Sequence, residues 1–134
     1  MANLLYPKGK EALLQSLDLS SVTVKAVLVD AADYTYSSSH DFLDDVPSGA
    51  RVGTPQTLSN KTFTDGVFNA DDITFTAVTG DVCEALVIYN DTPGAESGKH
   101  LIAYIDTATG LPVTPNGGNI NVAWDTGANK IFAL

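Results

Sequence analysis

The chain has a single cysteine, and this scarcity excludes two kinds of cross-link. Cys83 cannot form a disulfide within the chain, and one thiol cannot hold a metal cluster. Its neighbours Val82 and Glu84 carry no positive charge that would lower the thiol pKa and make it reactive. We therefore expect Cys83 to be a buried or half-buried, inert side chain.

Positive charge is also scarce. The 134 residues include 7 lysines and arginines against 16 aspartates and glutamates, which gives a net charge of −9. The basic residues are scattered along the chain, at Lys8, Lys10, Lys25, Arg51, Lys61, Lys99 and Lys130. Because nucleic-acid binding requires a positive surface that neutralises phosphates, we expect no nucleic-acid partner. An acidic chain of this kind is suited to staying soluble and to docking onto a basic surface.

Long apolar runs are missing as well. No segment approaches the roughly 20 apolar residues of a transmembrane helix. Residues 1–8 lack the charged start, the long apolar core and the cleavage site of a signal peptide. We expect a soluble protein that is synthesised in a cytoplasm and has no membrane partner.

Catalytic patterns are weak, since the chain has only 2 histidines. His40 stands beside Asp41, which could orient it as a base, but the serines at 37–39 lack the sharp turn of an activated nucleophile. His100 begins a predicted strand, where a position at the rim is expected. No phosphate-binding glycine loop, zinc spacing or dinucleotide fingerprint is present. The sequence predicts no catalytic residue and no cofactor.

Two acidic groups deserve separate consideration, at Asp41, Asp44 and Asp45 and at Asp71 and Asp72. Calcium takes oxygen ligands, but the Asp-x-Asp-x-Asp-Gly loop and its bidentate glutamate are missing. Paired carboxylates also serve in glycoside hydrolases, although one small domain with a single tryptophan makes a poor sugar cleft. We interpret both groups as solvated loop charge and expect no metal site.

What the chain does have is a series of short segments in which apolar and polar residues alternate, typical of β-strands. These segments lie at residues 21–30, 54–58, 60–65, 72–78, 84–90, 100–106, 119–125 and 130–134. Their spacing of about 8–12 residues is typical of sandwiches and barrels. We predict a mainly β, single-domain fold over residues 1–134. It would be a sandwich or jelly-roll-like barrel of about eight short strands with one N-terminal helix.

The N-terminal helix is predicted over residues 7–18. Leu13, Leu14 and Leu17 fall on one apolar stripe that would pack on the β core. A single helical turn is predicted at 39–46, with Ser39 as its N-cap.

Two turns complete the prediction. Asn116-Gly117 favours a hairpin that joins an incoming edge strand at 111–115 to the strand at 119–125, either through a two-residue turn or through a three-residue loop with a bulge that includes Gly118. The loop at 91–98 is small and polar, and is expected to form a mobile, exposed tip.

Six apolar or aromatic residues are candidates for an interface. Leu4, Leu5 and Tyr6 precede any regular element, so residues 1–6 could form an extended arm that lies on a neighbouring molecule. Deleting residues 2–6 would then abolish binding while leaving the fold intact. The loop aromatics Tyr34, Tyr36 and Phe42 either anchor an interface or cover the open end of the β core.

The chain resembles a group of small virion-associated structural proteins of tailed bacteriophages. The likeness lies in the segments at 22–30, 34–36, 39–46, 101–118, 122–125 and 127–132, and it covers nearly the whole chain. The resemblance implies a structural role on the virion, nearest to the decoration or cement proteins of phage capsids. The implied partners are the major capsid protein and further copies of the chain itself, as a dimer or trimer. No family residue with an assigned function is carried over.

Two alternatives stay open at this stage. One is another virion position, as a head–tail connector, tail or fibre-associated subunit. The other is a carbohydrate-binding attachment module, in which Tyr89, Tyr104 and Trp124 would stack on sugars. These three aromatics lie within apolar strands, which favours core packing instead.

Overall fold

The computed structural model describes residues 3–15 and 17–134, and its centre is a five-stranded antiparallel sheet. The strand order is β1-β7-β6-β2-β3. The strands are β1 (Leu4–Leu5), β2 (Val24–Val29), β3 (Arg51–Thr57), β6 (Ala85–Asn90) and β7 (Leu101–Ile105). As predicted for the segment with Pro55, β3 forms one edge of the sheet.

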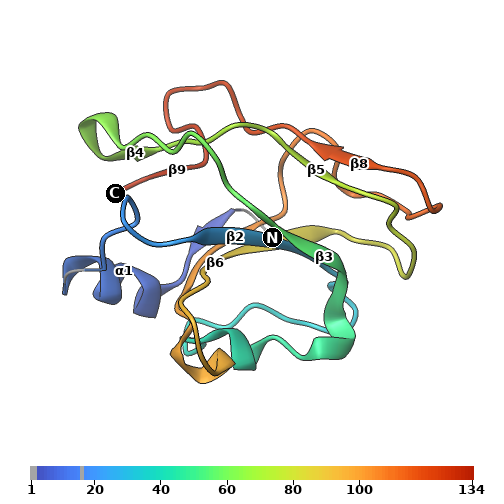
Figure 1. Ribbon diagram of the computed structural model, residues 1–134, viewed down its shortest axis with the longest axis horizontal. Helices are drawn as coiled ribbons and strands as arrows, with labels where there is room; N and C mark the ends of the chain where they lie inside the picture. Colours follow the sequence, from blue (N-terminus) through green and yellow to red (C-terminus); the bar gives the residue numbers. More distant parts are fainter. Residues whose placement is uncertain (1–2, 16) are drawn as a thin grey trace.

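The central sheet is covered on both faces (Figure 1). One face carries two short ribbons: β4 (Val67–Phe68) pairs with β9 (Phe132–Ala133), and β5 (Ile73–Phe75) pairs with β8 (Ile120–Val122). The other face is covered by the segment from 31 to 50, which holds the 3-10 turns η1 (Leu43–Asp45) and η2 (Ser48–Ala50). Two further 3-10 turns are η3 (Thr64–Gly66) and η4 (Glu96–Gly98). The predicted mainly β sandwich is confirmed, with nine short strands.

Burial on both faces follows from the sequence of the central strands. Every residue of β6 is buried, and five of the six residues of β2 are. Alternate side chains of β2 serve two separate apolar clusters: Val24, Ala26 and Leu28 face the ribbons, and Val27 and Val29 face the 31–50 segment. A strand that is apolar on both faces belongs in the middle of a sheet.

A bulge in β7 changes which side chains share a face. Ile88 and Tyr89 of β6 pair with Ala103 and Leu101, so Ile102 is the extra residue. Ile102 and Ala103 therefore both join the cluster beneath the ribbons, while Leu101 and Tyr104 face the 31–50 segment.

The N-terminal helix α1 (Pro7–Leu14) is shorter than predicted and packs through a different face. Its buried residues are Gly9 and Ala12, and Leu14 is 87% exposed. A Cβ on Gly9 would lie 2.5 Å from the carbonyl oxygen of Leu101, so the helix backbone rests directly on β7 at the bulge. The predicted leucine stripe is thus wrong for Leu14, because glycine at position 9 lets the smaller side face the sheet.

The expected N-terminal arm is part of the sheet. Leu4 and Leu5 form β1 opposite Tyr104 and Ala103 of β7, and the Tyr6 amide donates a hydrogen bond to the Ile102 oxygen at 3.0 Å. Residues 1 and 2 of the expected arm lie outside the described residues. Deletion of residues 2–6 would therefore remove an edge strand, contrary to the expectation that the fold stays intact.

The predicted hairpin at Asn116-Gly117 is a turn, but it does not join two paired strands. Gly117 has the expected positive φ of 88°, and the Asn116 side-chain oxygen accepts a hydrogen bond from the Gly118 amide. The segment at 119–125 pairs instead with β5. The segment at 111–115 forms an isolated bridge, between Val113 and Cys83, and no ladder with its neighbours among the described residues. Prolines at two of its five positions lack the amide donors that a ladder needs.

Two other predicted elements are shorter or differently built. The segment at 60–65 contributes one bridge, between Thr62 and Asn69, and then enters η3. The helical turn predicted at 39–46 is η1, and its start is held by the Asp45 carboxylate, which accepts from the Asp41 amide at 2.9 Å. Ser39 therefore does not cap it.

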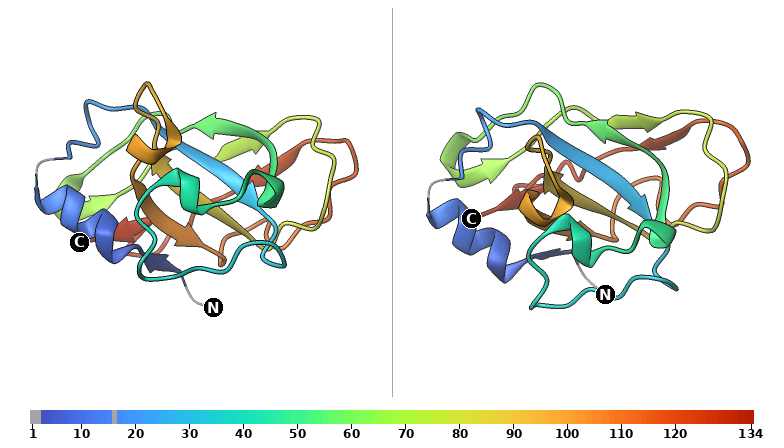
Figure 2. Two further views of the ribbon diagram at one scale, coloured as in Figure 1. Left: turned by 90° about the horizontal axis from the view of Figure 1, so that it is seen from below. Right: turned by 60° about the horizontal axis from the view of Figure 1, so that its bottom comes forward.

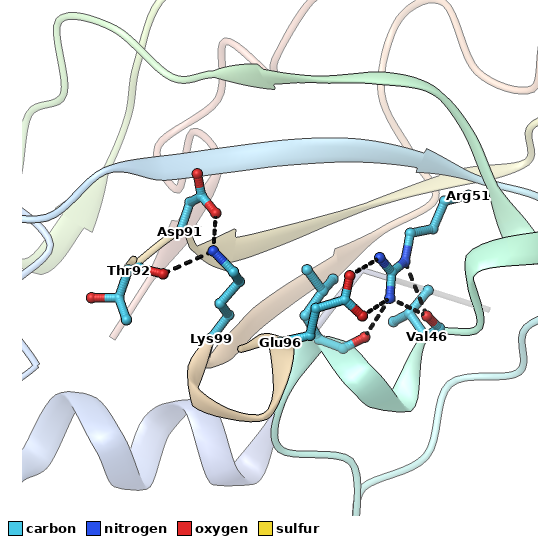
Figure 3. A network of polar contacts seen from close by, with 7 residues as sticks. Val46, Arg51, Asp91, Thr92, Glu96 and Lys99 are labelled. Atoms are coloured by element: carbon cyan, nitrogen blue, oxygen red, sulfur yellow. Dashed lines mark hydrogen bonds and ion pairs between the residues drawn. The ribbon is translucent and has the colours of Figure 1, made fainter. Parts of the chain in front are cut away.

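The loop at 91–98, expected as a mobile tip, is tethered at both ends (Figure 3). Arg51 donates to both carboxylate oxygens of Glu96, at 2.7 and 2.8 Å, and also to the carbonyl oxygens of Leu43 and Val46. The Lys99 ammonium group contacts the Asp91 carboxylate at 2.5 Å. These contacts tie the loop, β3 and the 31–50 segment into one cover.

Within the described residues, no helix combines the length and the apolar character needed to cross a membrane.

Candidate functional site

The structure brings three of the six predicted interface residues together in one tyrosine cluster. Tyr6, Tyr34 and Tyr36 meet Tyr104 from the central sheet, so the cluster joins three segments far apart in the sequence. The ring centroids of Tyr6 and Tyr36 lie 5.0 Å apart, and Tyr104 lies 6.2 Å from Tyr34 and 5.9 Å from Tyr36. The rings are tilted relative to one another, an arrangement that aromatic pairs favour.

The other three predicted residues lie elsewhere. Phe42 packs its ring against His100 at 4.7 Å and is half-buried. Leu4 is 37% exposed on the edge strand, and Leu5 is half-buried beside it. Tyr34 and Tyr36 thus lie over one face of the central sheet and not at an open end of the β core, while Phe42 belongs to a separate contact. That these residues form an interface stays a prediction.

Inside the tyrosine cluster the hydroxyl groups form a short chain of hydrogen bonds. The hydroxyls of Tyr6 and Tyr34 lie 2.7 Å apart, and the Tyr34 hydroxyl lies 2.9 Å from Nδ1 of His40. Tyr36 donates to the backbone oxygen of Leu5 at 3.3 Å. Burial raises the pKa of Tyr34 to about 12, and burial likewise raises that of Tyr6. These phenols therefore stay neutral across the physiological range.

His40, considered above as a base beside Asp41, instead ends this chain of hydrogen bonds through its contact with the Tyr34 hydroxyl. Its ring stacks on Tyr34 with centroids 5.4 Å apart. The nearby serines bond to each other, with the Ser37 and Ser39 hydroxyls 2.9 Å apart. The arrangement holds the 31–50 segment against the sheet.

A hollow of about 480 Å³ opens beside the tyrosine cluster. We call it the tyrosine hollow. Its described lining includes three tyrosines and two carboxylates and has no basic side chain: Ala31, Tyr34, Thr35, Tyr36, Glu84, Tyr104, Asp106 and Pro112. Glu84 Oε1 accepts a hydrogen bond from the Ala31 amide at 2.9 Å, which fixes this carboxylate at the wall. Burial raises the pKa of Tyr104, and the negative charges of Asp106 and Glu84 add to that effect.

A second hollow, of about 390 Å³, is mostly apolar. We call it the apolar hollow. Its lining residues come from the end of the α1 region, from β4 and its approach, and from β9 with the C-terminal residue. Figure 2 shows the C-terminus beside α1 and the β4–β9 ribbon. The apolar walls of the hollow are Leu13, Leu17, Leu19, Phe63, Val67, Phe68, Phe132 and Leu134. Leu134 is 65% exposed and Phe63 is 39% exposed. The interface candidates chosen from the sequence missed this hollow, because its residues come from three segments that have no common pattern.

The acidic groups considered for calcium have structural roles. The Asp72 carboxylate accepts from the Trp124 amide at 3.0 Å, the Asp71 carboxylate accepts from Asn60, and Asp45 holds η1. A different group, Asp30, Asp33 and Asp81, has carboxylate oxygens within 4.8 Å of one another. Such acidic groups are common on proteins without an ion, and this one defines no site by itself.

The remaining candidates from the sequence are packed inside the protein. Tyr89, Tyr104 and Trp124 are 3%, 4% and 6% exposed, as expected for core residues, so stacking on a sugar is not open to their ring faces. Cys83 is buried, and burial raises the pKa of its thiol to about 11, as expected for an inert cysteine.

The chain matches no protein-family model, and a search of curated proteins gives no match either.

Proposed function

We propose that the chain is a structural protein of a tailed-bacteriophage virion, and that it acts as a decoration or cement protein on the head. In this role it binds the outer surface of the major capsid protein lattice and stabilises it. The sequence resemblance supports this class. The function requires a rigid domain and a docking surface, and it requires no reaction centre.

The observation that carries the proposal is the apolar hollow. Contiguous apolar surface on a small domain marks a protein-binding site, because leaving it in water is unfavourable. Leu134 and Phe63, which line it, expose 65% and 39% of their surface. A partner side chain that fills this hollow would bury apolar residues from the end of the α1 region, from β4 and from β9.

The charge of the chain supports a protein partner with a basic face. With a net charge of −9, the chain is attracted to such a face over distances near the Debye length. Charge of this kind speeds the encounter, while the apolar hollow supplies the contact that slows dissociation.

Copy number in purified virions tests the function itself. Quantitative mass spectrometry against the major capsid protein should give a ratio near one or another large simple fraction. A dozen copies or fewer would assign the chain to a connector, tail or fibre position instead. Its complete absence from virions would overturn the proposal.

A surface variant tests the docking site. Leu134→Asp should reduce binding to heads that lack the protein by about tenfold or more, because it places a charge at the rim of the hollow. Val82→Asp is the matched control, since Val82 is also an exposed apolar residue, at 40%, and does not line the hollow. Circular dichroism should show both variants folded. Equal binding by the two variants would exclude the apolar hollow as the docking site.

A further inference from the structure

The tyrosine hollow combines aromatic walls with negative charge, on the face of the sheet opposite the ribbons. Tyr104 comes from the central strand β7, while Tyr34 and Tyr36 come from the segment that covers it. Hydrogen bonds to Tyr6 and Leu5 fix the two covering tyrosines, so the walls are set before any ligand arrives. A preformed hollow of about 480 Å³ falls within the usual range for small-ligand sites.

The charged residues that line the tyrosine hollow are all negative. Glu84 and Asp106 lie in its wall, and the described lining contains no lysine, arginine or histidine. The Asp30, Asp33 and Asp81 group lies close by, since Ala31 of the wall directly follows Asp30. The negative charges of Asp106 and Glu84 also act on the central sheet, where they add to the effect of burial in raising the pKa of Tyr104. A cation in the hollow would therefore be held by charge from more than one side.

The walls also decide which kind of cation fits. Calcium and magnesium need six or more oxygen ligands, and a wall of aromatic rings cannot supply them. An ammonium group is strongly hydrated, whereas a guanidinium group is planar, weakly hydrated and stacks on aromatic rings. A guanidinium group can also bind a carboxylate through two hydrogen bonds.

We infer that the tyrosine hollow binds a guanidinium group, presented by an arginine side chain of a protein partner. The half-buried Tyr36 ring contacts its plane, the buried Tyr34 and Tyr104 side chains form the floor beneath it, and the Glu84 carboxylate accepts its hydrogen bonds. Free arginine fits less well, because its own carboxylate would meet Glu84 and Asp106 with no basic wall residue to receive it. The site does not depend on the proposed head function, and any arginine-bearing partner could use it.

The test is a titration of the isolated protein, followed by NMR chemical shifts and by calorimetry. The probes are the capped peptide acetyl-Gly-Arg-Gly-amide, its lysine counterpart, free L-arginine and spermidine, all at low ionic strength. The arginine peptide should shift the amides around Tyr36 and Glu84 in a saturable way. It should bind at least about threefold more tightly than the lysine peptide or free arginine.

Variants then separate the site from general charge attraction. Glu84→Gln keeps an oxygen that can accept from the Ala31 amide and removes the charge. It should therefore weaken binding of the arginine peptide by about fivefold or more. Tyr36→Leu removes the half-buried ring and should weaken binding of the arginine peptide by about threefold. Glu11→Gln on α1 is the matched control, because it makes the same change at an exposed position, and binding should change less than twofold.

Three results would overturn the inference. These are no saturable shift in the wild-type hollow, equal losses for Glu84→Gln and Glu11→Gln, or tighter binding of spermidine than of the arginine peptide. Because the titration uses the chain alone, its failure would leave binding to phage heads untouched. Loss of head binding in Leu134→Asp would equally leave the peptide titration unchanged.

Discussion

Replacing Gly9 with alanine should change the free energy of unfolding through two effects of opposite sign. Alanine is the better helix former, by about 1 kcal/mol in a helix interior. A Cβ at position 9, however, would lie 2.5 Å from the Leu101 oxygen, about 0.9 Å inside ordinary contact distance, and 3.1 Å from the Ile102 Cα. Both neighbours are backbone atoms of β7 at its bulge, so they cannot rotate away. Either α1 lifts off the sheet or the bulge moves.

The steric effect should prevail. Overpacking of a tightly packed contact costs about 1–3 kcal/mol, and here no flexible side chain can relieve it. We expect Gly9→Ala to lower the free energy of unfolding by about 1–2 kcal/mol and the Tm by roughly 3–10 °C. Urea unfolding followed by circular dichroism measures this directly. Hydrogen exchange should also show faster exchange of the Tyr6 amide, whose acceptor is the Ile102 oxygen beneath the helix.

Gly49→Ala is the matched control, because a Cβ at Gly49 meets nothing within 4 Å. This change should leave stability within about 0.5 kcal/mol or raise it slightly, since it restricts only the unfolded chain. The reasoning would be refuted if Gly9→Ala stabilised the protein as much as Gly49→Ala does. That result would mean that α1 does not rest on β7 through its glycine.

Four further predictions concern residues with titratable side chains. Hydrogen bonds from Arg51 lower the pKa of Glu96 below 4.5, so their stabilising effect is present above pH 4.5 and is lost as pH falls through the lowered pKa. Glu96→Gln should therefore cost up to about 1 kcal/mol in urea unfolding at neutral pH, and the difference from wild type should shrink in acid. Burial raises the pKa of Tyr34 from 10.0 to about 12, so stability should hold below pH 10 and fall between pH 10 and 12; tyrosinate absorbance should rise over the same range. Tyr6→Phe should cost about 1 kcal/mol in thermal unfolding, and a gain would contradict the shared hydroxyl bond. Cys83 should react with a thiol reagent at mild alkaline pH only as fast as the protein unfolds, and rapid labelling of the folded chain would contradict its burial.

The central strands were predictable from local sequence, because they are short apolar segments bounded by turn residues and are buried on both faces of the sheet. Segments 84–90 and 100–106 contain β6 and β7, and segment 72–78 contains β5. Even within these segments the pattern failed where the backbone departs from regular geometry. Ala77 has a positive φ of 50°, and beyond it Val78 becomes the buried residue while Ala77 is exposed. Counting every second residue cannot anticipate such a reversal.

Pairing partners were harder to predict than strands. The Asn116-Gly117 turn has the expected chemistry, but the strand after it pairs with β5, which lies more than 40 residues earlier. Turn residues fix a local change of direction, whereas the choice of partner depends on which edges the whole fold leaves free. The short helix shows the same limit. Leucines at helical spacing predicted its packing face, but a single glycine allowed a closer contact on another side.

The tyrosine hollow shows why a site can be partly visible in a sequence and still incomplete. Tyr34 and Tyr36 stand out because aromatics are unusual in a polar loop, and both line the hollow. Tyr104 was assigned to an ordinary core strand, and regular alternation would place it on the face opposite Leu101. The bulge at Ile102 instead brings Leu101 and Tyr104 to the same face, beneath the loop tyrosines.

The bulge in β7 also contacts Gly9 of α1 and accepts a hydrogen bond from the Tyr6 amide, so helix, edge strand and hollow all depend on one extra residue in β7. It follows that a perturbation of this bulge, as in Gly9→Ala, should reach the tyrosine hollow as well as the helix. The arginine peptide titration on that variant would detect the effect as weaker binding, even though position 9 does not line the hollow.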